Sequence, residues 1–300
     1  MSKWRDKIKN LLLGIVLLMN VGVFAQVEKL SRAQHLYEAK DADRAILAID
    51  SVVLHPSTKN DFSAWSLRAF IYFEKYKRTD RLKLNSNLRD TVVSSVKKSM
   101  SLKPDAEYVT NNKKLITTIA SGYYNLAKAF LQDSIDDARS QKAYVKYKEV
   151  FVLGEPGANL TAKDIEYYLA VGSVFSDIFI NDNNNLKAQK VAKTALLKVL
   201  ELQPDNPAGN LNLGLMYFNQ AINLAKSMDY DTDISQAEII QENIVKLAKQ
   251  SEQYILKVYK NDPKNKKAVQ ALYYIYRLLF DQKKSDEFKQ KCTELGINLD

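Results

Sequence analysis

Apolar residues recur along this chain in runs with helical spacing, and prolines separate the runs. The stretch "LQPDNPAGNLNLGLMY", residues 202–217, shows the arrangement: one run ends, two prolines follow three residues apart, and a second run begins. Proline cannot continue a helix, but it is well suited to the first turn of a new one. The pattern therefore predicts two helices joined by a sharp turn at Pro204 and Pro207.

Prolines in this setting recur with a rough period of fifty residues. They are Pro56, Pro104, Pro156, Pro204 and Pro263, with spacings of 48, 52, 48 and 59 residues. Self-similarity with a period in this range is typical of repeat proteins, in which each unit buries its apolar face against its neighbours.

The helical runs before three of these prolines share one spacing. Each has a small or β-branched residue, a second apolar or β-branched residue four positions later, and a third residue three positions after that. The sets are Val92, Val96 and Ser99; Ala192, Leu196 and Val199; and Ser251, Ile255 and Val258. Spacings of four and three place side chains on one helical face. The small residues among them let a neighbouring helix approach closely.

The helices after the prolines also repeat a motif, which is clearest as Leu213-Gly214-x-x-Tyr217. Its counterparts are Val171-Gly172-x-x-Phe175, Leu272-Tyr273-x-x-Tyr276 and Trp65-x-x-Arg68-Ala69-x-x-Tyr72. Glycine inside a helix costs about 1 kcal/mol relative to alanine, so its recurrence indicates close backbone approach at that position. We expect the helices that flank Pro204 and Pro207 to pack antiparallel, with Gly214 at the contact.

A first helix with Leu-Gly-x-x-Tyr and a second helix with small, aromatic and small residues, closed by proline, resembles the tetratricopeptide repeat (TPR) family. The resemblance covers residues 61–104 and 161–300, and more weakly 27–60 and 108–156. It implies an all-α fold, a right-handed solenoid of stacked antiparallel helix hairpins. The units here are near fifty residues long, against about 34 in the family, so we expect longer helices or longer turns. Arg68 and Tyr273 also depart from the family's leucine and glycine.

The first 25 residues have the features of an export signal. Basic residues from Lys3 to Lys9 precede the apolar run Leu11–Phe24, and Val23-Phe24-Ala25 offers a cleavage point before Gln26. About 14 apolar residues are too few for a membrane-spanning helix, which needs roughly 20. An uncleaved anchor is the alternative. We expect a bacterial periplasmic or secreted protein without stable membrane insertion after signal cleavage.

The remainder, residues 26–300, is expected to form a single TPR-like repeat domain. Its approximate units are 27–56, 61–104, 108–156, 161–204, 207–263 and 266–300.

Composition argues against an enzyme. The chain has only nine glycines, no phosphate-binding glycine motif, two histidines outside any catalytic motif, and one cysteine, Cys292. No nucleophile–base pair is evident, so we predict neither catalysis nor a cofactor. The formal charge of +9 falls to +6 once residues 1–25 are removed, and the lysines are scattered among acidic residues. This distribution does not favour nucleic acid as a partner.

Asp229, Asp231 and Asp233 have the alternate spacing of a calcium loop. Ile234 stands where the loop needs glycine, and Ile240 stands where it needs glutamate. We therefore predict no metal site, and expect a solvated turn with carboxylates that cap a helix.

The TPR resemblance implies that inward side chains of each first helix bind a protein or peptide partner along a concave groove. By motif position these are Ser66, Phe70, Phe73, Leu215, Phe218, Tyr274 and Arg277. The alternative for the aromatic side chains is packing between helices. The alternative function is non-enzymatic binding of small ligands or glycans. A carboxylate clamp of the kind some family members use is not predicted, because Ala271, Leu169 and Ser173 replace its polar residues.

Overall fold

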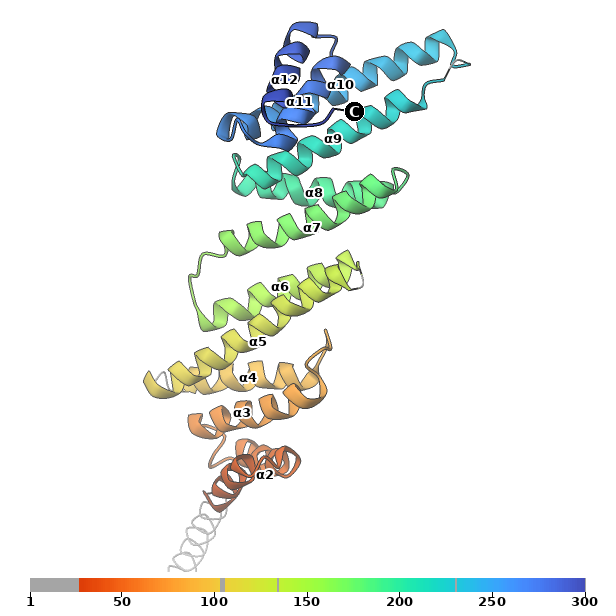
Figure 1. Ribbon diagram of the computed structural model, residues 1–300. Coiled ribbons are helices and arrows are strands. Elements are labelled where there is room, and N and C mark those ends of the chain that lie inside the picture. Colours follow the sequence, from red (N-terminus) through yellow and green to blue (C-terminus); the bar gives the residue numbers. More distant parts are fainter. Residues whose placement is uncertain (1–26, 103–105, 134, 230, 300) are drawn as a thin grey trace, which may run out of the picture. The chain divides into compact units, whose positions relative to one another are not determined.

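The computed structural model describes residues 27–102, 106–133, 135–229 and 231–299, and in these ranges all regular structure is α-helix (Figure 1). The chain divides into two compact units, one up to Ala158 and one from Asn159. The predicted export signal, residues 1–25, lies outside the described residues. Within the described ranges, no helix combines the length and the apolar character needed to cross a membrane.

The first unit consists of antiparallel helix hairpins. Helical residues 27–38 precede α2 (Ala42–Leu54), α3 (Phe62–Thr79), α4 (Asn87–Leu102), α5 (Ala106–Gln132) and α6 (Asp137–Gly154). The pairs α3–α4 and α5–α6 form hairpins, and α5 packs against both helices of the preceding pair. Each hairpin therefore covers the apolar side of the one before it.

The second unit repeats this arrangement. Its helices are α7 (Thr161–Asn181), α8 (Leu186–Leu202), α9 (Pro207–Ser227), α10 (Ile234–Asn261), α11 (Lys266–Leu278) and α12 (Gln282–Glu294). The hairpins are α7–α8, α9–α10 and α11–α12, and the first helix of each later pair packs on both helices of the pair before it. Each unit is thus an all-α, TPR-like stack of helix hairpins, as predicted, and much of the extra length lies in helices such as α5 and α10, with 27 and 28 residues.

The repeated spacing of small and apolar residues marks the packed face of the second helices. All nine residues of the three sets are at most 2% exposed. In the last set, Ser251 also donates a hydrogen bond of 2.7 Å from its Oγ to the carbonyl oxygen of Gly214. The small residue therefore does more than allow close approach, because it ties α10 to the backbone of α9.

Gly214 lies at a close helix contact, but its neighbour differs from the prediction. A Cβ atom at this position would lie 2.6 Å from Cδ1 of Ile255, on α10. The predicted neighbour was the helix before Pro204, which is α8. The glycine faces its own hairpin partner because the motif residues of a first helix point into the hairpin. Gly172 of α7 has the same relation to Leu196 of α8, with 2.6 Å from the added Cβ to Cδ2.

A four-residue turn recurs at three connections in the second unit. In each, the N–H of an asparagine donates to the carbonyl three residues earlier, at 3.0 Å, and its side chain caps the following helix. The capping residues are Asn185, Asn206 and Asn265. Pro207 follows Asn206 in the first turn of α9, as predicted. After the sharp turn at Pro204, the Asn206 side chain thus accepts a hydrogen bond from the N–H of Gly209, which has no acceptor within the first turn of α9.

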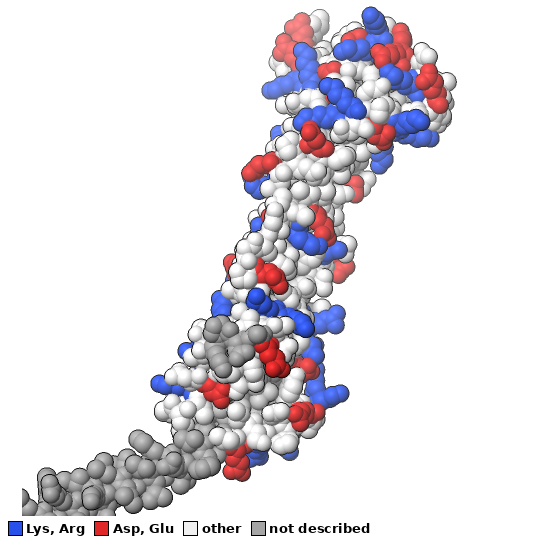
Figure 2. Space-filling model, turned by 90° about the vertical axis from the view of Figure 1, so that its left-hand side faces the viewer, with Lys and Arg blue, Asp and Glu red and all other residues white. Residues whose placement is uncertain are grey.

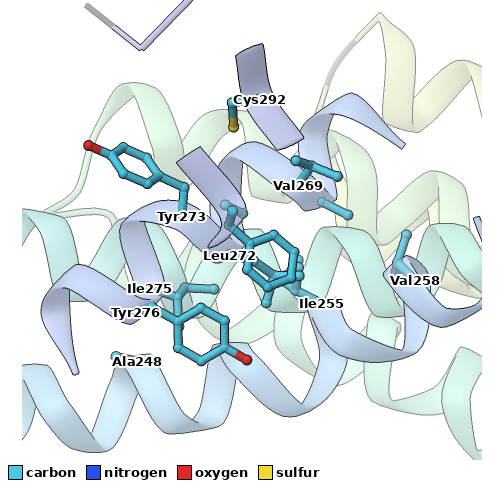
Figure 3. Close-up of a cluster of buried hydrophobic side chains, with 12 residues drawn as sticks. Ala248, Ile255, Val258, Val269, Leu272, Tyr273, Ile275, Tyr276 and Cys292 are labelled. Carbon is cyan, nitrogen blue, oxygen red and sulfur yellow. The ribbon is translucent and has the colours of Figure 1, made fainter. Parts of the chain in front are cut away.

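The core of the last two hairpins is an aliphatic and aromatic cluster drawn from α10, α11 and α12 (Figure 3). It includes Ile255, Leu272, Tyr276 and Cys292, all at most 3% exposed. Burial raises the pKa of the Cys292 thiol, so this cysteine is a packing residue and not an activated nucleophile.

Candidate functional site

Ser66, Phe70 and Phe73, the predicted partner contacts of the first unit, lie on α3. Ser66 is 3% exposed, and its Oγ donates to Oδ1 of Asn112 on α5 at 2.9 Å. Asn112 in turn donates to Oγ of Ser99 on α4 at 3.1 Å. The Ser66 hydroxyl is therefore buried and hydrogen-bonded to another helix of the same unit. Phe70 and Phe73 are half-buried, and the ring of Phe73 stacks on Tyr76 at 6.1 Å.

Arg68, which departs from the family's leucine, connects three helices of the first unit. Its Nε donates to Oδ1 of Asp50 on α2 at 2.7 Å, and its Nη1 donates to Oγ of Ser95 on α4 at 2.7 Å. Tyr72, one turn further along α3, donates to the second carboxylate oxygen of Asp50 at 2.7 Å. At position 68, hydrogen bonds of an arginine thus take the place of the apolar packing that a leucine would provide.

A hollow in the first unit runs between α4 and α6, and we call it the α4–α6 groove. Its wider part, about 620 Å³, lies between the α3–α4 loop and the first half of α6. A narrower part, about 260 Å³, continues toward the ends of α4 and α6. Both parts are lined by Asp90, Tyr123 and Lys146, so they form one continuous surface with Tyr123 of α5 at its floor.

A buried arginine lies beneath this floor. Arg89 is fully buried, and its guanidinium carbon lies 3.8 Å from the ring centroid of Tyr123. Its Nη2 donates to the carbonyl oxygens of Lys83 and Leu84, at 2.8 and 2.5 Å, which fixes the α3–α4 loop that forms one wall of the groove. Among the described residues no carboxylate pairs with Arg89, and its Nε has no hydrogen-bond acceptor. The charge under the floor is therefore not neutralised by an ion pair.

Side chains on the rim add to this positive charge. Lys97, Lys142 and Lys146 line the groove together with two carboxylates, Asp90 and Glu149. Lys146 pairs with Glu149 at 2.7 Å, and this hydrogen bond raises the pKa of Lys146. With Arg89 included, the groove carries two more positive than negative charges.

Apolar surface lies beside these lysines. Val145, on the groove wall of α6, is 44% exposed, and half-buried Leu84 lies across from it. Figure 2 shows basic and acidic side chains interspersed over the face in view. The α4–α6 groove thus combines an apolar wall with a local excess of positive charge.

In the second unit the structure brings the predicted residues together. Leu215 and Phe218 of α9 and Tyr274 of α11 pack against one apolar core, and the rings of Phe218 and Tyr274 are 6.3 Å apart. Tyr274 and exposed Arg277 also line a cleft of about 330 Å³, at the far ends of α9 and α11.

Phe280 stands at the end of this cleft. It is 75% exposed and has a positive φ of 59°. Two residues of the first unit have a similar conformation, Lys40 with φ 61° and Ile135 with φ 50°, and each of the three is followed by an aspartate that caps the next helix. The conformation is therefore that of a helix-ending turn, in which a non-glycine residue carries some strain.

Sequence reasoning missed the α4–α6 groove, and none of the seven predicted residues lines it. The prediction considered only first helices, whereas this groove is walled by the second helices α4 and α6. Two signals in the sequence pointed to it. Arg89 interrupts the buried face of a helix, and Val145 stands among lysines on the exposed face of another.

The remaining candidates for chemistry have structural partners. Asp229 accepts hydrogen bonds from the N–H of Asp231 and from Oγ1 of Thr232, and Asp233 caps α10, as expected. His55 contacts Oγ of Ser57 at 2.7 Å, and His35 is exposed beside Glu38. In the described part of the chain, no group of three or more potential ligands is arranged to hold a metal ion.

Comparison with known proteins gives likenesses in structure alone. No family model and no curated protein matches the sequence. Among solved structures, the chain is similar to PilW, described as a widely conserved type IV pilus biogenesis factor, at 14% identity and a TM-score of 0.31, over 90% of this chain and 93% of PilW. It is also similar to the C-terminal part of a TPR repeat-containing protein from Cytophaga hutchinsonii, at 16% identity and a TM-score of 0.24, over 89% of this chain and 95% of that one.

A third similar structure is the human IFIT1 dimer with m7Gppp-AAAA, at 16% identity and a TM-score of 0.34. The match covers 89% of this chain and 49% of IFIT1, so the chain spans about half the length of that protein.

Proposed function

We propose that this chain is an exported scaffold of the TPR family that binds a segment of a protein partner in the bacterial cell envelope, without chemistry. The observation that carries the proposal is the α4–α6 groove: a continuous surface with an aromatic floor, an apolar wall and an excess of positive charge. Grooves of this size between helices are typical binding sites in helical proteins.

The charges and shape of the groove specify the kind of segment that fits. Val145 and Leu84 offer apolar contact to aliphatic side chains of a partner. Lys97 and Lys142 form no ion pair with another described residue, and their charges therefore favour acidic side chains of a partner. The uncompensated guanidinium of Arg89 raises the positive potential at the floor, where water is partly excluded. We therefore propose a partner segment that carries acidic and aliphatic residues together.

Export belongs to the same proposal. It is supported by the basic start, the short apolar run and the small residues before Gln26. Mass spectrometry of the protein from a cell-envelope fraction is expected to find a mature N-terminus near Gln26. An unprocessed protein confined to the cytosol would contradict the export part of the proposal.

Partner binding is tested with peptides of defined sequence. A displayed library of random 12-residue peptides is selected on the purified protein, and the affinity of enriched peptides is measured by fluorescence anisotropy. Enriched peptides are expected to combine acidic and aliphatic residues and to bind more weakly as salt rises. Lys142→Glu and Val145→Asp are each expected to weaken binding about tenfold or more, which corresponds to about 1.4 kcal/mol.

Matched controls carry the same changes away from the groove. Lys114 is an exposed lysine of α5 that lines neither part of the groove, and Leu47 of α2 is 75% exposed. Lys114→Glu and Leu47→Asp are expected to leave peptide affinity unchanged within about twofold. Equal losses in the groove variants and the controls, or enrichment of basic peptides, would refute the α4–α6 groove as the binding site.

A further inference from the structure

The segment that follows α12, residues 296–299, turns back and lies alongside α11 (Figure 1). Gly296 makes the turn with a positive φ of 63°, and the N–H of Ile297 donates to the carbonyl oxygen of Cys292 at 2.8 Å. Glycine is suited to this position because a side chain disfavours positive φ. The helix end thus directs the chain back over the preceding helix.

Two side chains of α11 hold this segment by its backbone. Nε2 of Gln270 donates to the carbonyl oxygen of Asn298 at 3.2 Å, and Oη of Tyr274 donates to the carbonyl oxygen of Leu299 at 2.7 Å. Gln270 and Tyr274 are one helical turn apart, so the segment runs in the same direction as α11.

The side chains of the segment alternate between the core and solvent. Ile297 and Leu299 are half-buried and pack against the core of the last two hairpins, whereas Asn298 between them is exposed. Backbone hydrogen bonds combined with alternate buried side chains are the means by which proteins bind extended peptides. Residues 297–299 are therefore bound to α11 as a peptide ligand would be.

The surface continues beyond the segment. Tyr274, which holds the carbonyl of Leu299, also lines the 330 Å³ cleft, whose next α11 residue is the exposed Arg277. Arg277 donates a long hydrogen bond of 3.4 Å to Oη of Tyr273, and its charge faces the open cleft. The direction of the segment along α11 leads toward this arginine.

We propose that the face of α11 formed by Gln270, Tyr274 and Arg277 is a second docking surface, and that residues 296–299 occupy it in cis. Its partner is an extended segment with aliphatic side chains at alternate positions, followed by an acidic residue for Arg277. The inference rests on the proposed function in that it assigns this chain a second site for protein segments. The bound cis segment is the observation that specifies the partner.

Because residues 296–299 occupy the α11 surface, they control whether a partner can bind there. A segment joined to its site by a short connection has an effective concentration in the millimolar range, so a partner in trans must compete with it. The surface becomes available when the segment is removed or displaced. Because Gln270 and Tyr274 donate hydrogen bonds to backbone carbonyls of the segment, an extended chain with matching side chains can meet the same two donors.

The test uses a fluorescent peptide with the sequence of residues 295–300, Leu-Gly-Ile-Asn-Leu-Asp, blocked at both ends. Its affinity is measured by anisotropy for the intact chain and for a chain that ends after Leu295. The shortened chain is expected to bind the peptide at least about tenfold more tightly than the intact chain. A peptide with serine in place of both aliphatic residues is expected to bind the shortened chain about tenfold more weakly.

An intact chain that carries Ile297→Ser and Leu299→Ser serves as a second open form if the shortened chain loses helicity. Equal peptide affinity for the open and intact forms, or equal affinity of the aliphatic and serine peptides, would overturn the inference. Lys142→Glu in the open form separates this site from the α4–α6 groove and is expected to leave the affinity for Leu-Gly-Ile-Asn-Leu-Asp unchanged. Loss of library-peptide binding in the groove variants, without binding of this peptide, refutes the α11 site alone.

Discussion

Asp50 is the residue that joins the first hairpins of the first unit. Its two carboxylate oxygens accept hydrogen bonds from Arg68 and Tyr72, each at 2.7 Å, and the guanidinium of Arg68 also lies 4.6 Å from the ring centroid of Tyr72. Burial and, after it, the bond to Asp50 raise the pKa of Tyr72 to about 12. The hydroxyl of Tyr72 thus holds its proton to a higher pH in the folded protein than in the unfolded chain.

This pKa predicts how stability depends on alkaline pH. Because the folded-state pKa of Tyr72 exceeds the ordinary value of 10.0, its contribution is fully present below pH 10 and is lost as pH rises toward about 12. Tyr72→Phe is expected to be less stable at pH 8 and to lose less stability between pH 10 and 12 than the parent. Urea unfolding at a series of pH values measures both. Parallel pH profiles for the two proteins would contradict the role of the Tyr72–Asp50 bond.

Helices in this chain meet at closely matched positions of small and large residues. Gly214 of α9 accommodates Ile255 of α10, and the same pair of elements is tied by the hydrogen bond from Ser251 to Gly214. Alanine at 214 would gain about 1 kcal/mol of helix propensity. It would also place a methyl group 2.6 Å from Cδ1 of a fully buried isoleucine, and overpacking of this kind costs about 1–3 kcal/mol.

A double-mutant cycle resolves these opposing effects. Gly214→Ala is expected to destabilise the second unit by about 1 kcal/mol, whereas in an Ile255→Ala background the same change is neutral or stabilising. Gly122→Ala is the matched control, since its added Cβ would meet Oη of Tyr76 at an ordinary 3.5 Å, and it is expected to stabilise the protein. Denaturant unfolding measures all four changes. Additivity at 214 and 255 would show that the two helices do not meet at this glycine.

The sequence predicts those features of the helices that depend on residues close together in the chain. Helix ends, the turn at Pro204 and Pro207, and the buried face with Ser251 and Val258 follow from proline placement and helical spacing, both of which are local. Which helix faces Gly214 was predicted wrongly, because one face of a helix does not reveal which neighbour covers it. The α4–α6 groove escaped prediction for the same reason: two helices separated by α5 form it.

The seven predicted partner contacts illustrate the same limit at the level of the site. Four of them lie close together in the second unit: Leu215, Phe218, Tyr274 and Arg277. Ser66, by contrast, is buried and takes part in a hydrogen-bond network between helices. Motif position says that a side chain points inward, but not whether a neighbouring helix or a partner covers it. A role of these residues in partner binding stays a prediction, and the experiment on the α11 surface tests it for Tyr274 and Arg277.

The molecule consists of two units of stacked hairpins, and we propose for each a surface suited to an extended segment. In the first unit the α4–α6 groove is open, and its charge favours an acidic and aliphatic partner. In the second unit the α11 surface already holds residues 296–299. We therefore expect a partner segment to bind first at the open α4–α6 groove.

The most direct test of this account is hydrogen–deuterium exchange of the intact protein with and without a library-selected peptide. We expect slower exchange in α4 and α6 and unchanged exchange in α2. Protection confined to helices other than α4 and α6, or no protection at saturating peptide, would contradict the claim that the α4–α6 groove is the binding surface.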